Sequence, residues 1–347
     1  MKKTALYLLF LCAILSCFSS CAGTSKKYTS YSFDYFDTVT SVTGYARNEK
    51  AFNAVCTEIF AMLEDYHRLY TVYERYEGLE NLCTVNALTD GVHRTVKVDQ
   101  RIMDLLIYAK EIHEQTEGKT NIAMGSVLSI WHEYREKGSK DPKNASLPPT
   151  GILEDAAAHT DISGIQLDTE ACTVTLTDPA MRLDVGAIAK GYAVEMIARA
   201  LEEKNIEGYL LNVGGNVRVI GAKPDGSPWI IGIENSNGHT DEPYAAYLSL
   251  KDESVVTSGS YQRYYTVDGK RYHHIIDPET LFPAENFLSV SVICQSSATG
   301  DALSTALFCM SYEEGLSLVN STEGVEAMWI FPDGEKRYSE GFSSYIV

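Results

Sequence analysis

Helical and strand-like hydrophobic patterns occupy different parts of this 347-residue chain. Apolar residues recur at helical spacing over 48–74, and two more helices are predicted at about 99–117 and 123–138, each followed by or ending at a glycine. Beyond residue 163, short alternating segments separated by glycine turns predict antiparallel strands, including a hairpin closed by Asp268–Gly269. Segregated helices and hairpins favour the α+β class over a doubly wound parallel sheet.

The last third continues this mixture, with a predicted strand at 288–294, a helix at about 299–310, and then a further helix and closing strands. A polar, proline-containing loop at 139–151 is a candidate junction between two subdomains. The length is within the range of one large unit, so we predict a single α+β domain over 31–347.

The N-terminus has the pattern of an export signal. Two lysines precede an unbroken apolar run and small residues, so residues 1–20 are predicted to be a signal peptide, too short for an ordinary spanning helix. The run FSSC resembles a bacterial lipoprotein processing site at which Cys21 is lipidated, although Phe18 stands where leucine is commoner. A cut at Cys17, a plain secreted protein and an uncleaved anchor are the alternatives. Residues 21–30 are predicted to be a polar tether.

Charge and cysteine content exclude two classes of function. The formal net charge of -18 argues against nucleic-acid binding, which needs clustered lysine and arginine. It also means that a phosphorylated ligand would have to be held by local cations. The cysteines of the body are scattered without a C-x-x-C pair, so we expect small buried residues and neither a zinc site nor a disulfide framework.

The stretch RLDVGAIAKGYAVEMIARAL, residues 182–201, joins an apolar strand-like run to an amphipathic helix. Gly186 leaves exposed amides at the helix start, Lys190 follows within one turn, and Asp184 ends the apolar run. A helix N-terminus with a nearby lysine favours an anion such as a phosphate. A plain turn with a solvated lysine explains the same residues, and the stretch alone does not decide between them.

A second candidate is TGDALSTALFCM, in which Asp301 and Thr305 share a face of a predicted helix. A carboxylate with a hydroxyl, and no histidine or cysteine, suits a hard cation such as Mg²⁺. The alternative is an aspartate near a helix N-terminus and a threonine packed on the sheet.

A third candidate is RYHHIIDPETLFPAEN. Alternation places one histidine on each side of the strand, so at most one shares the face of Ile276, and a histidine is the usual general base near neutral pH. A structural histidine is the alternative. Together, the three candidates would make a site that acts on a phosphate bond if the fold brings them together.

At these residues the chain resembles the ApbE family, the FAD:protein FMN transferases. The resemblance covers almost everything after the tether, in order, and it is carried by LDVGAIAKGYAVE, LLNVGGNVRVIGAKPDGSPWIIGI, VVTSGSYQRYYTVDGKRYHHIIDPET and GDALSTALF. Earlier runs, YERYEGLENLCTVNA and TNIAMGSVLSIW, fit the family's N-terminal part.

The resemblance implies a lipid-anchored enzyme on the outer face of the bacterial cytoplasmic membrane. It implies Mg²⁺-dependent cleavage of FAD and transfer of FMN to a threonine or serine of a target protein, with release of AMP. Subunits of sodium-pumping quinone reductases, Rnf-type complexes and exported flavoproteins are the implied acceptors. A FAD diphosphatase, a non-catalytic FAD-binding lipoprotein and an extracellular interaction domain are the alternatives.

Roles for individual residues follow from the resemblance as expectations. His274 would be the base for the acceptor hydroxyl. The metal ligands would be Asp301, Thr305 and a backbone oxygen of Ala187. The FAD contacts would be Tyr76, Thr120, Asn121, Ile122, Asp184, Lys190 and Ile276.

Three positions depart from the family's pattern. Leu281 stands where glycine is common, Ala187 where some members have threonine, and Ser304 where some carry an extra carboxylate. The last two changes imply a metal shell that depends more on water and phosphate.

Overall fold

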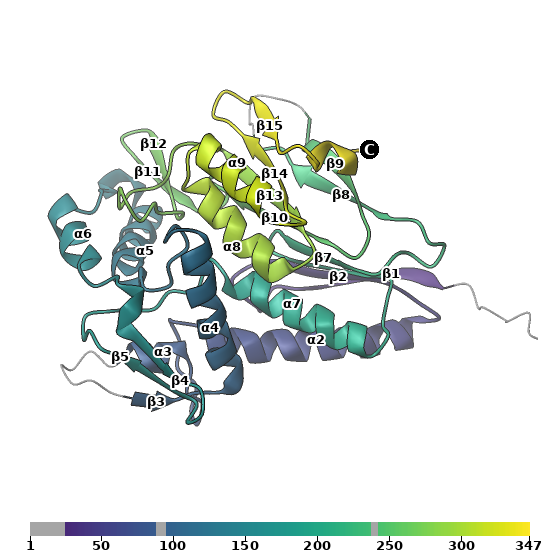
Figure 1. Cartoon of the computed structure of the whole chain (residues 1–347), viewed down its shortest axis with the longest axis horizontal. Coiled ribbons are helices and arrows are strands. Elements are labelled where there is room, and N and C mark those ends of the chain that lie inside the picture. Colours follow the sequence, from purple (N-terminus) through teal and green to yellow (C-terminus); the bar gives the residue numbers. More distant parts are fainter. Residues whose placement is uncertain (1–24, 88–94, 237–241) are drawn as a thin grey trace, which may run out of the picture.

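The computed structural model describes residues 25–87, 95–236 and 242–347 (Figure 1). The predicted signal peptide and both candidate processing sites, Cys17 and Cys21, lie outside these ranges. The largest element is an eight-stranded sheet in the order β1-β2-β6-β7-β10-β13-β14-β15, and every neighbouring pair is antiparallel. Its strands are β1 (Lys26–Ser32), β2 (Thr40–Ala46), β6 (Tyr209–Val213), β7 (Asn216–Ile220), β10 (Ser254–Gly259), β13 (Ser289–Cys294), β14 (Glu326–Ile330) and β15 (Lys336–Tyr338).

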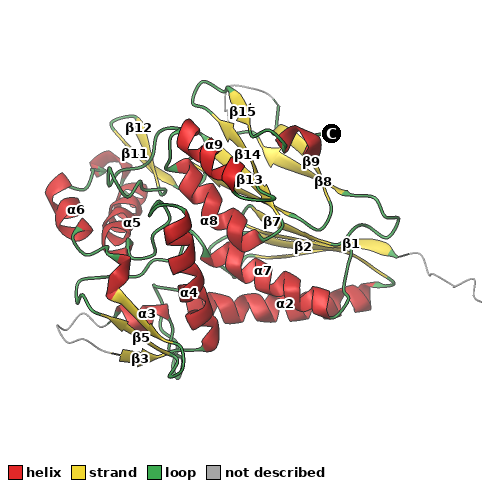
Figure 2. Ribbon diagram, in the orientation of Figure 1, coloured by secondary structure: helices red, strands yellow, loops and turns green. Residues whose placement is uncertain are grey.

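Both faces of this sheet are covered. Val292 of β13 packs into a core with α8, whereas Ile293 packs on the other side against the ribbon of β8 (Trp229–Glu234) and β9 (Tyr244–Leu250). Every residue of β13 is therefore buried, although strand neighbours point to opposite faces. The helices on the first face are α2 (Glu49–Tyr70), α7 (Ala189–Glu203), α8 (Ser297–Phe308) and α9 (Tyr312–Ser321) (Figure 2).

The remaining elements gather at one end of the sheet (Figure 1). The 16-residue helices α4 and α5 each bury an apolar face there, and a three-stranded sheet in the order β3-β5-β4 packs beside α4. These elements are α3 (Leu82–Asn86), β3 (Thr95–Lys97), α4 (Gln100–Gln115), α5 (Gly125–Lys140), α6 (Thr150–Ala157), β4 (Ile165–Asp168), β5 (Thr173–Leu176), β11 (Tyr264–Val267) and β12 (Lys270–His273).

The α+β prediction is confirmed, and so are the main helices and the β11–β12 hairpin. Two details differ. Residues 26–30, expected in the tether, belong to β1, because their backbone pairs with β2 and the Tyr28 ring stacks on Phe52 at 5.5 Å. The predicted loop at 139–151 contains a short 3₁₀ turn and begins α6, which is fastened to α5 by a hydrogen bond from Ser126 Oγ to the Ala156 carbonyl.

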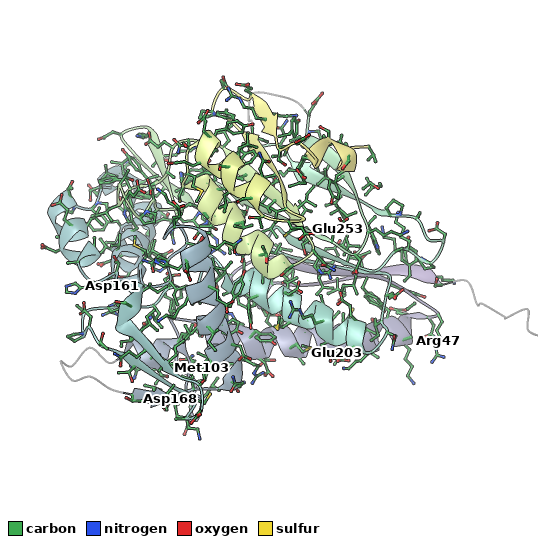
Figure 3. All side chains as sticks on the ribbon, in the orientation of Figure 1. Arg47, Met103, Asp161, Asp168, Glu203 and Glu253 are labelled. Carbon is green, nitrogen blue, oxygen red and sulfur yellow. The ribbon has the colours of Figure 1, made fainter. Side chains whose placement is uncertain are left out.

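Side chains fill the space between the layers (Figure 3). Met103 of α4 is fully buried in the largest core, whereas Arg47 and Asp168 lie exposed at the periphery. Within the described ranges, the helices are all too short or too polar to qualify as a candidate membrane span.

Candidate functional site

The segment that leads into α7 is irregular and not the strand that the sequence suggested. The side chain of Asn86 accepts from the Leu183 amide at 2.7 Å and donates to the Leu183 carbonyl at 2.8 Å. The next amide, of Asp184, donates to the Ile122 carbonyl at 2.8 Å. These contacts replace the partners that a strand would supply, and they hold the segment beside the start of α5.

The first turn of α7 crosses α8 at very short range. Gly191 makes this possible, because a Cβ at this position would lie 2.3 Å from the Ser297 carbonyl oxygen and 2.4 Å from Asp301 Cβ. The crossing places Lys190 and the amides of the α7 N-terminus directly against Asp301.

Asp301 is the most closely surrounded carboxylate in this region, and it is only 3% exposed. Its Oδ2 accepts from the Gly191 amide at 2.8 Å, and its Oδ1 accepts from Asn216 Nδ2 at 3.1 Å. Lys190 Nζ lies 3.3 Å from Oδ1 and 3.5 Å from Oδ2. One backbone donor, one neutral side chain and one cation therefore stabilise this buried charge.

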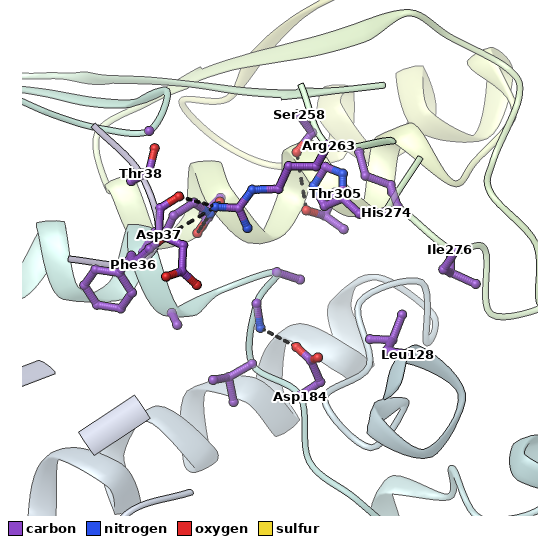
Figure 4. A pocket seen from close by; sticks show the side chains of 18 of the residues that line it. Phe36, Asp37, Thr38, Leu128, Asp184, Ser258, Arg263, His274, Ile276 and Thr305 are labelled. Carbon is purple, nitrogen blue, oxygen red and sulfur yellow. Dashed lines mark hydrogen bonds and ion pairs between the residues drawn. The ribbon is translucent and has the colours of Figure 1, made fainter. Parts of the chain in front are cut away.

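Three kinds of oxygen atom that could bind a metal ion lie in this region. Thr305 lies one turn further along α8, and its hydroxyl is 3.4 Å from Ser258 Oγ (Figure 4). In a regular helix the Gly191 amide would bond to the Ala187 carbonyl, but it donates to Asp301, so this carbonyl has no helical partner. A carboxylate, a hydroxyl and a free carbonyl fit a hard cation such as Mg²⁺.

The protein ligand set is nevertheless sparse. Nowhere in residues 25–87, 95–236 and 242–347 do three or more histidine, cysteine, aspartate or glutamate side chains gather in a group that could hold a metal ion. Ser304, at the position of the expected extra carboxylate, hydrogen-bonds to Ser258 Oγ at 2.8 Å. A cation here would therefore complete its shell with water and ligand phosphate, as Mg²⁺ usually does.

The two adjacent histidines have different surroundings. His273 is buried, with its Nε2 2.7 Å from the Ala284 carbonyl and its Nδ1 accepting from the Ile275 amide. His274 lines a cavity, and its Nδ1 is buried without a hydrogen-bond partner. Burial, assisted by nearby cationic groups such as Arg263, lowers the pKa of His274 to about 3. The ring is therefore neutral near pH 7, so one of its nitrogens can accept a hydrogen bond.

Several cations line the same cavity. Arg263 Nη2 donates to the Asp37 carbonyl at 2.8 Å and so joins the β10–β11 connection to the β1–β2 connection (Figure 4). Arg135 Nη2 lies 3.0 Å from His132 Nδ1, and burial lowers the pKa of this guanidinium. With Lys190, these groups supply the local positive charge that an acidic chain needs in order to hold a phosphorylated ligand.

Asp184 supplies a carboxylate on the other side of the cavity. Burial raises the pKa of Asp184, and a hydrogen bond from the Gly186 amide at 2.8 Å opposes this increase (Figure 4).

The cavity has a volume of about 520 Å³. It brings together nine of the eleven residues proposed for catalysis, metal and FAD, which come from four separate parts of the chain. They are Thr120, Asn121, Asp184, Ala187, Lys190, His274, Ile276, Asp301 and Thr305.

Two expected residues do not line the cavity. Ile122 is buried in the core and contributes its carbonyl to the Asp184 amide. Tyr76 packs under Arg68, whose guanidinium carbon lies 4.7 Å from its ring centroid. Tyr73, three positions before Tyr76, does line the cavity; it is 58% exposed and its ring centroid lies 4.9 Å from that of His132.

The sequence interpretation missed Asn216, Arg135 and Arg263. Asn216 directly follows the Gly214–Gly215 turn, and Arg263 lies in the glycine-bearing run SGSYQR, so local signals existed for both. Arg135 has no such local signal in the sequence, and only the tertiary structure places it in the lining of the cavity.

Comparison with known proteins places this chain in a family. Residues 36–329 match the model of the ApbE family. A FAD:protein FMN transferase of Treponema pallidum is 32% identical over 98% of this chain and 96% of its own length. A FAD:protein FMN transferase of Klebsiella pneumoniae is also 32% identical, over 76% of this chain and 81% of its own length.

Solved structures show the same architecture. The ApbE protein of Thermotoga maritima superimposes with a TM-score of 0.79 at 27% identity, over 92% of this chain and 99% of that protein. The flavin transferase ApbE of Vibrio cholerae has a TM-score of 0.76 at 23% identity, with the same coverage of both chains. The family model matches most of the chain, one relative matches it over nearly its whole length, and the fold is shared. The chain therefore belongs to the ApbE family.

Proposed function

We propose that this protein transfers FMN from FAD to a threonine or serine hydroxyl of another protein, with release of AMP, and that the reaction depends on Mg²⁺. The observation that carries the proposal is the joint position of Asp301, Lys190 and His274 in one cavity. A carboxylate for a cation, an ammonium for a phosphate and a neutral imidazole are the parts that hydroxyl attack on a diphosphate needs. The names of the relatives support the same activity.

The groups that would hold Mg²⁺ are the Asp301 carboxylate, the Thr305 hydroxyl and the Ala187 carbonyl. When bound, Mg²⁺ neutralises the charge of the diphosphate oxygens and of the leaving phosphate. Because the protein supplies few ligands, water and oxygens of the FAD diphosphate would complete the shell.

The cations of the cavity would hold the FAD diphosphate. Lys190 lies at the N-terminus of α7, where its charge and the helix amides act on the same anion. The Gly191 amide already donates to Asp301, so the start of α7 would hold the diphosphate beside this carboxylate.

His274 would accept the proton of the acceptor hydroxyl. The hydroxyl oxygen attacks the phosphorus of the FMN half, a new phosphorus–oxygen bond forms, and the bond to the bridging oxygen of AMP breaks. The proton would pass to the neutral ring of His274, and AMP would leave with the bridging oxygen and its electron pair. Without an acceptor, water is the competing nucleophile and the products are FMN and AMP.

The test is to incubate the protein with FAD, Mg²⁺ and an acceptor domain, and to measure FAD cleavage and the mass of the acceptor. Asp301→Asn, which keeps the volume but removes the charge, is expected to abolish cleavage and transfer. His274→Ala is expected to lose mainly transfer, by about 100-fold or more, since a positioned base contributes roughly 10²–10⁴. His159→Ala, outside the cavity, is the control.

Each outcome separates this proposal from the alternatives. If FAD is cleaved but the acceptor never gains FMN, the protein is a FAD diphosphatase. If FAD stays intact after Mg²⁺ is added, it is a flavin-binding protein. Full activity of Asp301→Asn would remove the metal assignment.

The setting of the reaction also belongs to the proposal. A signal peptide over 1–20 and lipidation of Cys21 would place the domain on the outer face of the bacterial cytoplasmic membrane. Acceptors would then be exported flavoproteins or membrane subunits, such as those of sodium-pumping quinone reductases or Rnf-type complexes. Both are in reach of an anchored enzyme.

A further inference from the structure

We infer that Asn216 is a positioning residue that orients the Asp301 carboxylate for the cation. This inference rests on the proposed function, since it concerns the same metal site. Asn216 is 1% exposed, and its Nδ2 donates to Asp301 Oδ1 at 3.1 Å. A carboxylate only accepts hydrogen bonds, so the nitrogen of the amide must face Asp301.

The position of Asn216 is set by its backbone. It is the first residue of β7, directly after a two-residue turn in which Gly214 and Gly215 have φ of 57° and 91°. Two left-handed residues in succession are typical of a type I′ hairpin turn, which fixes the strand register. A Cβ on Gly214 would also lie 2.3 Å from Thr38 Oγ1, so the turn packs closely against Thr38 and has no room for a side chain at this position.

The three partners of Asp301 differ in how they respond to a cation. The Gly191 amide belongs to the helix, and Asn216 has a short side chain at a fixed strand end, so both stay in place. Lys190 has a long, partly exposed side chain, and its charge repels an incoming divalent ion. We therefore expect that a cation bound at Asp301 would compete with Lys190 for the carboxylate, while Asn216 and the Gly191 amide would hold the carboxylate in one orientation.

The side-chain amide of Asn216 is uncharged, so it does not repel a cation that binds Asp301. An amide donor fixes one lone pair of Oδ1 without neutralising the charge that binds the cation, and a carboxylate has about four such acceptor positions. Contacts of this kind around a metal ligand typically change metal affinity or activity about 10- to 100-fold when they are removed. Asn216 also lies 3.5 Å from Ser297 Oγ, which donates to its Oδ1 and holds the amide plane.

Asn212 provides a matched control in the same hairpin. Its Oδ1 accepts from the Gly215 amide at 3.0 Å, so it stabilises the same turn, but it lies outside the lining of the cavity. Asn212→Ala and Asn216→Ala therefore make the same chemical change on either side of one turn. Only the second removes a contact to Asp301.

The experiment measures two quantities for the full-length protein. One is the Mg²⁺ concentration that gives half-maximal FAD cleavage, and the other is the shift of the melting temperature with added Mg²⁺ in the absence of FAD. Asn216→Ala is expected to raise the half-saturating Mg²⁺ concentration about 10- to 100-fold and to reduce the melting shift. The KM for FAD at saturating Mg²⁺ is expected to change little, and Asn212→Ala should retain the wild-type Mg²⁺ response.

The outcomes are distinguishable. Equal Mg²⁺ responses of Asn216→Ala and wild type, with Asp301→Asn losing them, would overturn the positioning role and leave the proposed function intact. If Asp301→Asn also responds as wild type, the metal assignment itself fails, and this inference with it. If Asn216→Ala does not fold, Asn216→Ser, which keeps a shorter donor, takes its place and is expected to show a weaker shift in the same direction.

Discussion

At the scale of residues, the cavity contains two buried ionisable side chains, Asp301 and His274, whose surroundings differ. Asp301 is a buried carboxylate with three donors, and His274 is a buried imidazole with an unpartnered Nδ1. The unpartnered Nδ1 of His274 costs stability in the absence of a ligand, because a buried polar group loses its hydrogen bonds to water. Such costs are common where a site is arranged for a ligand and not for stability alone.

Burial of His274 makes the stability of the protein depend on pH. The pKa of this group falls from an ordinary 6.5 to about 3 on folding, chiefly through burial, so the unfolded chain binds one more proton between these values. The free energy of unfolding is therefore expected to decrease as the pH falls below about 6.5, by up to about 1.4 kcal/mol per pH unit for this group.

Urea unfolding of wild type and His274→Gln at pH 7.5 and pH 5.0 checks this expectation. The variant should lose less stability between the two values than wild type does. His113 and His273, whose pKa values burial also lowers, keep part of the dependence in both proteins. An identical loss in wild type and variant would contradict the assigned cause.

At the scale of elements, the site depends on the contact between α7 and α8. The amphipathic pattern of α7 specifies that it packs on the sheet, and α8 is buried along almost its whole length, but the distance between the two helices is set by Gly191. The irregular segment before α7 is a second such case. Its apolar residues resembled a strand, and the side chain of Asn86, almost a hundred positions away, supplies the hydrogen bonds instead.

Gly191→Ala tests the helix contact. The new Cβ would meet the Ser297 backbone at 2.3 Å, which cannot move as a flexible side chain could. We expect a loss of about 1–3 kcal/mol of stability from overpacking, together with a loss of Mg²⁺-dependent activity because Asp301 is displaced. Thermal melting and FAD cleavage measure the two effects.

Gly151→Ala is the matched control, because nothing lies within 4 Å of a Cβ at this position in α6. Alanine is the better helix former, so this change should be neutral or stabilising by up to about 1 kcal/mol. If Gly191→Ala behaves like Gly151→Ala, the close crossing is not required.

At the scale of the whole molecule, the sheet brings distant segments to one cavity. Residues from β7, α7, α8 and the segment after β12 meet there, although 85 positions separate Asn216 from its partner Asp301. Arg263 joins two further connections across the cavity by its contact with Asp37. Four cationic side chains of an otherwise acidic chain therefore line the cavity where a phosphorylated ligand would bind: Lys119, Arg135, Lys190 and Arg263.

Membrane attachment is a prediction about the molecule as a whole. Wild type expressed in a bacterium is expected to incorporate a labelled fatty acid and to fractionate with membranes, and Cys21→Ala should lose both properties. Cys17→Ala should retain them. Labelling that is lost only in Cys17→Ala would show that the upstream cysteine is the processed one.

The sequence alone determined the fold class, the main helices and hairpins, and nine of the residues that line the cavity. Hydrophobic period and glycine turns are local properties, so they can be seen without coordinates. Candidates such as Asp301, Thr305 and His274 have residue types and spacings that suggest chemistry, but each also has an ordinary structural explanation. The family resemblance indicated that they belong to one site, because the motifs that contain them occur in the same order along the chain as in the family.

The tertiary structure decided which of these residues meet, and how. It showed that Tyr73 and not Tyr76 lies at the cavity, that Ile122 contributes its backbone within the core, and that Asn216 holds Asp301. Contacts of this kind depend on side-chain direction and on the distance between elements far apart in the chain. Hydrophobic periodicity carries neither quantity, because it reports only which side of an element is buried.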